Sequence, residues 1–462
     1  MKIKFPTAYS ILAILIIVLA VLTWIIPAGS YEYLADGEPI AGTYHAVAQN
    51  AQGVGAVFLA PLKGLYDAIE VAVFILMVGG FLGIVMETGA INAGINTIVQ
   101  KLKGREKLLI PILMFIFALG GTTFGMAEET IAFYPLVLPI VIAAGYDALV
   151  GVSIIMVGAG VGVLASTVNP FATGIASGFA GVSLGEGIIL RVIMLIVLLP
   201  IAVWYVMRYA EKVRANPQKS YVADMYESNR EHFIGEEYNT ALNGKQKIAL
   251  SLFGLTFLVM IYGVIPFDDL GVPLPVLGWW FPELSALFLI AGIIIGIFYR
   301  LKEEKLVDSF LFGAKDLLGV AFIIGISRGI TVIMNDGMIT DTILYWGESA
   351  LAGSGKSVFL ALMYLIFLPL SILIPSTSGL ATLAMPILAP LADFAGVGRD
   401  LVITAFQSAS GLINLLTPTS AVVMGGLAIG RVGYNRWLKF VWKLALILFA
   451  VSLALLLLGL LL

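Results

Sequence analysis

Long apolar stretches constrain this chain more than any other feature. A helix needs roughly 20 consecutive apolar residues to cross the hydrocarbon core of a bilayer. Stretches of that length recur along the whole sequence, and two of them are interrupted. We expect spans near 8–28, 70–88, 147–180 (interrupted), 186–207, 246–265, 283–300, 315–334, 400–430 (interrupted) and 440–462. The sequence therefore predicts an all-α polytopic membrane protein.

Composition excludes other classes of protein. Hydrophobic residues make up 60% of the 462 residues and charged ones only 12%, against about 25% charged in soluble domains. A net charge of -3 without a large basic block excludes a nucleic-acid partner. The absence of cysteine removes disulfides, thiolate nucleophiles and cysteine metal sites. Because the sequence also lacks an HExxH motif and a recognisable nucleophile–base pair, we expect no enzyme.

Basic residues orient the chain, because lysine and arginine concentrate in cytoplasmic loops. They cluster in 1–4, 101–107, 208–247, 300–305 and 431–443, which we assign to the inside. The segments 31–52 and 266–282 contain acidic but no basic residues and are assigned to the outside, with Arg399 as an exception to the pattern. Lys2 and Lys4 would also suit a signal peptide, but the apolar run after them is too long for a typical one. We expect an inner or plasma membrane protein with a cytoplasmic N-terminus and an outside C-terminus.

Two parts of the chain resemble each other at an offset of about 250 residues. The matching pairs are 74–91 with 322–339, 135–139 with 386–390, and 166–170 with 417–420. The segment after the first glycine-rich span is basic, whereas its counterpart at 338–355 contains acidic and no basic residues. The repeats are therefore expected to have inverted topology, a common design of secondary transporters.

Each repeat contains a stretch too short to span, followed by a polar turn and a second apolar stretch. We expect re-entrant helical hairpins at 108–143 and 357–393, with tips at 120–125 and 375–379. Non-helical backbone at membrane depth is tolerated only where protein or water satisfies it. The tips are therefore expected to border a binding site near the bilayer centre.

The interrupted spans carry prolines, which free a backbone carbonyl one turn earlier. Pro170 and Pro418 are surrounded by side-chain oxygens that suit a hard cation such as sodium. The candidate sodium ligands are Ser166, Thr167, Asn169, Thr417 and Ser420. The alternative is a simple proline kink whose hydroxyls bond to the helix backbone.

Three charged side chains are expected at membrane depth, where ionisable residues are costly and mostly functional. Adjacent helical residues point about 100° apart, so only one of Glu128 and Glu129 is expected to face a ligand. These carboxylates could bind a cationic or zwitterionic substrate, hold a coupling ion, carry a proton, or cap the following helix. Arg328 could clamp a substrate carboxylate or pair with a glutamate.

Three motifs together resemble a known family. They are Gly121–Thr130 (GTTFGMAEET), Pro375–Ala381 (PSTSGLA) and Leu416–Ser420 (LTPTS). The chain resembles the YfcC branch of the anaerobic C4-dicarboxylate carrier family, which includes proteins like arginine/ornithine antiporters. The resemblance implies the ion transporter superfamily, with homodimers, a scaffold part, a mobile transport part and an elevator motion.

The resemblance also implies site residues. Carried over to this sequence, the candidate substrate ligands at the tips and breaks are Thr122, Thr123, Asn169, Ser376, Thr377, Ser378, Thr417 and Thr419, with Ser166, Thr167 and Ser420 as further break ligands. Together with Glu128, Glu129 and Arg328, these residues form the expected site.

The expected protein is an ion-coupled or exchange secondary active transporter of small charged carboxylate-bearing metabolites, foremost amino acids, including basic ones. A C4-dicarboxylate carrier is the alternative within transport, and a passive channel is the alternative of another class. No cofactor is expected beyond sodium or a proton as coupling ion. The expected partners are the substrate, the coupling cation, the lipid bilayer and a second copy of the chain.

The domain organisation follows from these assignments. We expect an N-terminal helix and outside loop (1–52), a first repeat (53–207) with broken helix 147–180, a cytoplasmic linker (208–247), linking transmembrane helices (248–314), and a second repeat with the C-terminal helix (315–462) and broken helix 400–430.

Overall fold

The expected all-α architecture is confirmed. A computed structural model describes residues 8–34, 39–40, 42–91, 93–94, 97, 105–183, 185–234, 242–264, 267, 272–351 and 353–461. Within these residues the strands are two short ones, β1 (Gly29–Ser30) and β2 (His45–Ala46), which pair antiparallel. Lys2, Lys4, Lys101 and Lys103, used above for orientation, lie outside the described residues.

Long apolar helices make this a multi-pass membrane protein. Among the described residues, eight helices have the length and composition to cross a bilayer. They are α3 (Ile69–Glu87), α5 (Leu109–Phe124) with the preceding turn η1 (Glu106–Leu108), α9 (Ile188–Ala215), α11 (Gly244–Val264), α12 (Phe281–Tyr299), α13 (Glu303–Asp336), α15 (Lys356–Leu373) and α19 (Tyr434–Gly459). Six of them overlap expected spans, whereas α5 and α15, which were expected as hairpin arms too short to span, also have the length and composition to cross a bilayer.

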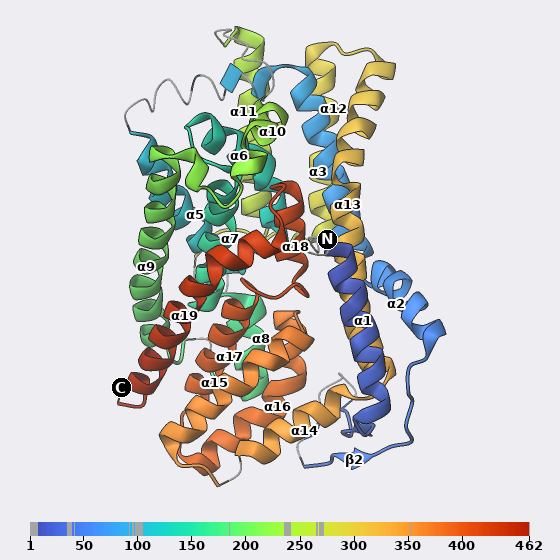
Figure 1. Cartoon of the computed structure of the whole chain (residues 1–462), viewed down its shortest axis with the longest axis vertical. Coiled ribbons are helices and arrows are strands. Elements are labelled where there is room, and N and C mark those ends of the chain that lie inside the picture. The colour runs from blue at the N-terminus through green and yellow to red at the C-terminus, as the bar shows by residue number, and fades with distance from the viewer. Residues whose placement is uncertain are drawn as a thin grey trace.

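Helix α13 differs most from its expected span, since it has 34 residues and begins well before the expected 315. It runs beside α3, α1 (Ala8–Ile25) and the unexpected helix α2 (Val54–Asp67), as Figure 1 shows. Glycines make the closest approach possible: a Cβ on Gly83 would lie 2.1 Å from the carbonyl oxygen of Ser309, and one on Gly64 would lie 2.3 Å from that of Gly325. These contacts are typical of small-residue helix packing in membranes.

Two similar series of elements form the rest of the molecule. The first is α5, the short 3-10 helix η2 (Glu128–Phe133), α6 (Tyr134–Ala143), α7 (Ala148–Leu164), the π-helical turn η3 (Pro170–Gly174) and α8 (Ile175–Ala180). The second is α15, α16 (Thr377–Ala395), α17 (Arg399–Ile413) and α18 (Ala421–Ile429). Helices α5 and α6 lie in the upper half of Figure 1, and α15 and α16 in the lower half. The pairs α5–α6 and α15–α16 therefore reach the centre from opposite ends of the molecule, whereas α8 of the first series lies in the lower half and α18 of the second in the upper half (Figure 1).

The first tip lies later in the chain than expected. Helix α5 continues to Phe124, and the chain turns at Gly125, which has φ 74°. The helix persists through 120–124 because it packs closely on α7; a Cβ on Gly121 would lie 2.3 Å from the carbonyl oxygen of Ala159. The expected tip at 120–125 is therefore corrected to 125–127. The second tip, between α15 and α16, is at 374–376, close to the expected position.

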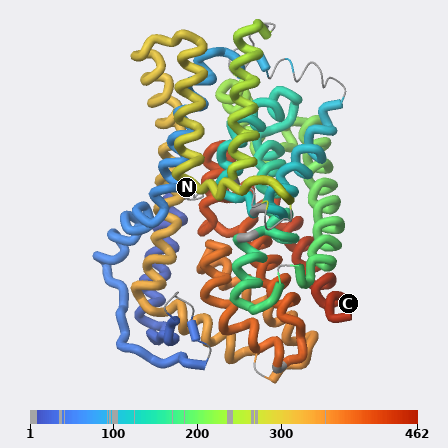
Figure 2. The backbone as a smooth tube through the Cα atoms, turned by 180° about the vertical axis from the view of Figure 1, so that it is seen from behind, coloured from blue at the N-terminus to red at the C-terminus, as the bar shows by residue number. Residues whose placement is uncertain are grey.

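The segment expected as a solvated linker is partly folded. Helix α9 extends to Ala215, and η4 (Pro217–Lys219), η5 (Ala223–Met225) and α10 (Tyr226–Ile234) follow. Arg436 lies 2.6 Å from Asp224, which ties this segment to the start of α19. Figure 2 shows that the same end of the molecule holds the ends of α11 and α12, opposite the end with α14 (Thr340–Leu351). Arg191, near the start of α9, is buried with 1% exposure.

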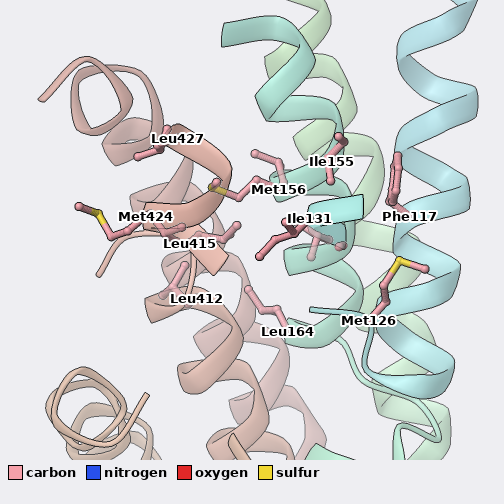
Figure 3. Packing of buried hydrophobic residues seen from close by; sticks show 14 of the residues in the cluster. Phe117, Met126, Ile131, Ile155, Met156, Leu164, Leu412, Leu415, Met424 and Leu427 are labelled. Atoms are coloured by element: carbon pink, nitrogen blue, oxygen red, sulfur yellow. The ribbon is translucent and has the colours of Figure 1, made fainter. Parts of the chain in front are cut away.

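An apolar layer joins the two series at the centre. Leu412 of α17 and Leu415 of the break face Met156 and Ile131 of the first series, whereas Met424 of α18 points away from them (Figure 3). All five side chains are buried. This layer packs the two breaks against each other and forms part of the wall of the central cavity.

Candidate functional site

A cavity of about 180 Å³ lies where both tips and both breaks meet. Helices α12 and α13 complete its wall. The polar and aromatic lining residues are Glu128, Glu129, Thr130, Asn169, Phe171, Trp280, Phe281, Ser327, Arg328, Ser376, Thr377, Ser378, Asn414, Thr419 and Ser420. Segments far apart in the sequence are thus brought to one place.

The last turn of α5, just before the first tip, is bonded to the first break. Thr122 Oγ1 donates to the carbonyl oxygen of Ala165 at 2.8 Å, and the backbone N–H of Thr167 donates to Thr122 Oγ1 at 3.0 Å. Thr167 Oγ1 donates to the Thr122 carbonyl oxygen at 3.1 Å. Thr122 and Thr167 therefore hold the tip and break together behind the cavity and do not line it.

The first break is shaped by Asn169, which is 1% exposed. Its Oδ1 accepts hydrogen bonds from the backbone N–H groups of Phe171 at 2.9 Å and Ala172 at 3.2 Å. Its backbone carbonyl accepts from Thr173 and Gly174, both at 2.9 Å, which forms the π-helical turn. Asn169 thus stabilises the unwound backbone while its side chain borders the cavity.

The second tip presents hydroxyl groups. Ser376 caps α16 by accepting from the backbone N–H of Gly379 at 3.2 Å, and its Oγ lies 3.3 Å from Ser378 Oγ. Thr377 Oγ1 lies 3.3 Å from Ser410 Oγ of α17. All three tip hydroxyls line the cavity at the N-terminal end of α16, where the helix dipole favours a negative group.

The hydroxyl groups of the second break bond mainly to nearby protein groups. Thr419 Oγ1 donates to the Ile372 carbonyl oxygen at 2.7 Å, and Ser420 caps α18 by accepting from Val423 at 3.4 Å. Thr417 Oγ1 lies 2.7 Å from Thr419 Oγ1 but is itself behind the cavity wall. The hydroxyls around Pro418 thus largely satisfy local backbone groups.

Both adjacent glutamates line the cavity, which corrects the expectation that only one would. The 3-10 helix η2 begins at Glu128, so both carboxylates stand at the helix end that borders the cavity. Glu129, 8% exposed, accepts from the backbone N–H of Ala127 at 3.1 Å and so also caps the tip.

Glu128 and Arg328 are the uncompensated charges of the cavity. Both are half-buried, and in the described part of the chain neither has a hydrogen-bond or ion-pair partner. They are therefore not paired with each other. Buried or partly buried charges normally find a partner. A cavity with the unpaired carboxylate of Glu128 and the unpaired guanidinium of Arg328, beside a second carboxylate at Glu129 that accepts from a backbone N–H, fits a ligand that carries both signs.

The expected site residues fall into two groups. Those that line the cavity are Glu128, Glu129, Asn169, Arg328, Ser376, Thr377, Ser378, Thr419 and Ser420. Those that do not are Thr122, Thr123, Ser166, Thr167 and Thr417. Thr123 Oγ1 bonds within its own helix, to the Leu119 carbonyl oxygen at 2.6 Å.

Some residues that line the cavity were not among the expected site residues. Trp280 and Phe281 were assigned to an outside loop, although an aromatic pair directly before an apolar span was a usable signal. Ser327 precedes Arg328, and Asn414 directly precedes the second break. No motif singled out these two residues.

Metal-binding groups are sparse. Among the described residues, no three His, Cys, Asp or Glu side chains gather in a way that could hold a metal ion. In the first expected sodium site, Ser166 Oγ is buried without a hydrogen-bond partner, whereas the oxygens of Thr167 and Asn169 are engaged with the protein. Ser166 Oγ is thus the free oxygen of this set, and a sodium ion there stays a prediction.

Comparisons with known proteins cover nearly the whole chain. The model of the DcuC family, described as C4-dicarboxylate anaerobic carrier, matches residues 5–461. A Haemophilus influenzae protein described as uncharacterized is 35% identical over 95% of this chain and 93% of its own. An Escherichia coli K12 protein with the provisional name basic amino acid antiporter YfcC is 31% identical over 97% of this chain and 94% of its own. The solved structure of the Alcanivorax borkumensis YdaH transporter, reported to have an unusual topology, aligns over 98% of both chains with TM-score 0.42 and 14% identity.

Proposed function

The chain belongs to the C4-dicarboxylate anaerobic carrier family, and from that premise we propose that it is a secondary active transporter of amino acids, basic ones foremost. One observation carries the proposal: Glu128 and Arg328 line one cavity and are both unpaired within the described residues. A guanidinium clamps a carboxylate bidentately. A carboxylate on the cavity wall, such as that of Glu128, attracts an ammonium or guanidinium group.

Further support comes from the second tip. The hydroxyls of Ser376 and Thr377 at the N-terminal end of α16 offer donors to the same substrate carboxylate. The provisional name of the Escherichia coli relative, basic amino acid antiporter, agrees with this choice of substrate.

A C4-dicarboxylate carrier is the second candidate, favoured by the description of the family. A dianion would meet Arg328 favourably, but it would also lie near the carboxylates of Glu128 and Glu129. Two like charges in one poorly hydrated cavity are unfavourable unless a cation or proton compensates them. In that case the glutamates would serve the coupling ion.

For the mechanism we propose an elevator motion in a homodimer. The two hairpins, α5–α6 and α15–α16, together with the broken helices would move against a scaffold that contains α3, α12 and α13. The contacts favour this division: α13 packs mainly on α3 and α2, whereas α5 packs on α7 and α15 on α17. The motion would be driven by exchange, by a sodium gradient or by a proton gradient.

Uptake into proteoliposomes tests the function. Labelled L-arginine and succinate are offered separately, with an arginine, succinate, sodium or proton gradient imposed. We expect saturable arginine accumulation that an opposing arginine gradient accelerates. Accumulation of succinate alone would select the dicarboxylate carrier, and flux that neither saturates nor concentrates solute would indicate a channel.

A further inference from the structure

Gln407 is a fully buried amide in the middle of α17, with 0% exposure. Its Nε2 donates to the carbonyl oxygen of Ser166 at 2.9 Å, and its Oε1 accepts from Thr173 Oγ1 at 2.7 Å. Both bonds reach from the second series of elements to the first break. A buried amide whose donor and acceptor are both used is strongly fixed in orientation.

The two bonded residues stand at the two ends of the unwound loop. Ser166 precedes Asn169 and Phe171, which line the cavity, and Thr173 follows them. Thr173 Oγ1 also lies 3.3 Å from the Ser166 carbonyl oxygen, so the loop ends are close together. A single side chain thus holds both ends of the loop from the side away from the cavity.

We propose that Gln407 is a positioning residue that sets the shape of loop 166–173 and thereby the placement of Asn169 and Phe171 in the substrate cavity. The inference rests on the proposed transport site, but Gln407 itself does not line the cavity. It acts through Ser166 and Thr173.

The same helix extends this connection to the second tip. One turn after Gln407, Ser410 Oγ lies 3.3 Å from Thr377 Oγ1 and 3.5 Å from Asn414 Nδ2. Helix α17 is therefore hydrogen-bonded to the first break through Gln407 and to the second tip through Ser410, one helical turn later. A substrate that displaces Thr377 would therefore also displace α17. The hydrogen bonds of Gln407 would transmit this displacement to the first break.

The second break is held differently. Trp437 Nε1 donates to the Leu415 carbonyl oxygen at 2.8 Å, and Tyr434 OH donates to that of Leu416 at 2.7 Å. Both donors come from α19, not from the first series of elements. Neither of these two donors corresponds to Gln407 at the second break. Loss of the Gln407 amide should therefore disturb the first break and leave the second unchanged.

The test compares Gln407→Met with Thr404→Val. Methionine has about the length of glutamine without its hydrogen bonds. Thr404 is equally buried on α17, and its hydroxyl donates to the Asp400 carbonyl oxygen within the same helix. Hydrogen exchange of the purified, monodisperse proteins is measured by mass spectrometry. We expect roughly tenfold faster exchange in peptides that cover 166–174 of Gln407→Met, with 414–420 unchanged and Thr404→Val like the parent protein.

Binding of L-arginine gives a second readout. We expect Gln407→Met to weaken it about tenfold, and Thr173→Val to add little in the Gln407→Met background because both changes remove the same bond. Unchanged exchange in 166–174, or unchanged arginine affinity of Gln407→Met, would overturn the proposal. If the parent protein binds no arginine, the proposed substrate is wrong, while the exchange experiment still decides the role of Gln407.

Discussion

The rings of Phe171 and Trp280 lie 5.0 Å apart between centroids, inclined at 45°. Phe171 belongs to the π-helical turn of the first break, whereas Trp280 directly precedes α12, where Glu283 accepts from its backbone N–H at 3.0 Å. Helix α12 packs on α3 and α11, and the π-helical turn packs on α8, α16 and α17. Two bundles thus meet at this aromatic pair, on the wall of the cavity.

Joining these two positions should therefore stop transport. The chain contains no cysteine, so Phe171→Cys with Trp280→Cys can be linked by a short bifunctional thiol reagent. We expect arginine exchange in proteoliposomes to fall to background after linking, because the contact must slide when the bundles move. The two single-cysteine variants treated alike serve as controls. Undiminished exchange in the linked protein would contradict relative movement of the bundles.

Thr122→Val should weaken the closure between the first tip and the first break. The hydroxyl is 2% exposed and bonds to both Ala165 and Thr167, so its loss should cost about 1–3 kcal/mol of unfolding free energy. Thr123→Val is the matched control, since that hydroxyl bonds only to Leu119 in its own helix among the contacts described. Thermal unfolding followed by intrinsic fluorescence should separate the two variants, and equal midpoints would refute the assigned role of Thr122.

Glu128→Gln and Glu129→Gln should differ in effect. Glu128 has no partner among the described residues, so its charge is available to the substrate, and we expect arginine affinity to fall at least tenfold, or about 1.4 kcal/mol. In Glu129→Gln the amide oxygen can still accept from Ala127, so the tip should stay intact and the loss should be smaller. Titration calorimetry in detergent measures both; a larger loss in Glu129→Gln would reverse the assignment.

Asp147→Asn should destabilise the N-terminal end of α7. The carboxylate is 2% exposed and accepts from Val150 at 2.8 Å, Tyr209 at 2.7 Å and Ser220 at 2.6 Å. An amide has one acceptor oxygen, so we expect a loss of about 1–3 kcal/mol. Asp224→Asn removes an exposed ion pair with Arg436 and should cost at most about 1 kcal/mol. Similar melting temperatures for both variants would show that the buried network contributes little.

The sequence predicted most long helices because their hydrophobicity is decisive. The expected spans 246–265 and 283–300 match α11 and α12 within two residues at each end. Helix α13 was underestimated because its first turns are charged, with Glu303 and Asp308 among them. Those turns stay helical because their glycine and serine positions pack against α3. Helix α2 was missed because Pro61 and Lys63 interrupt its apolar pattern.

The sequence indicated some of the residues that line the cavity and others that do not line it. Glycine and proline indicated where the backbone is irregular, although the first tip lies later in the chain than expected. They did not indicate where each hydroxyl points, and so Thr122 and Thr167 bond to each other's segments behind the cavity. No irregular motif marks Trp280 or Gln407 in the sequence. Trp280 reaches the cavity wall because α12 packs on α3, and Gln407 reaches the first break because α17 packs on α7.

Binding of three ligands to the parent protein and to Arg328→Gln tests the central claim most directly. L-arginine carries a carboxylate and a guanidinium, agmatine lacks the carboxylate, and succinate lacks the cation. The parent protein should bind arginine best, and Arg328→Gln should weaken arginine at least tenfold while leaving agmatine nearly unchanged. We predict that the cavity binds both charged groups of an amino acid. A parent protein that prefers succinate, or an arginine affinity that Arg328→Gln leaves unchanged, would contradict it.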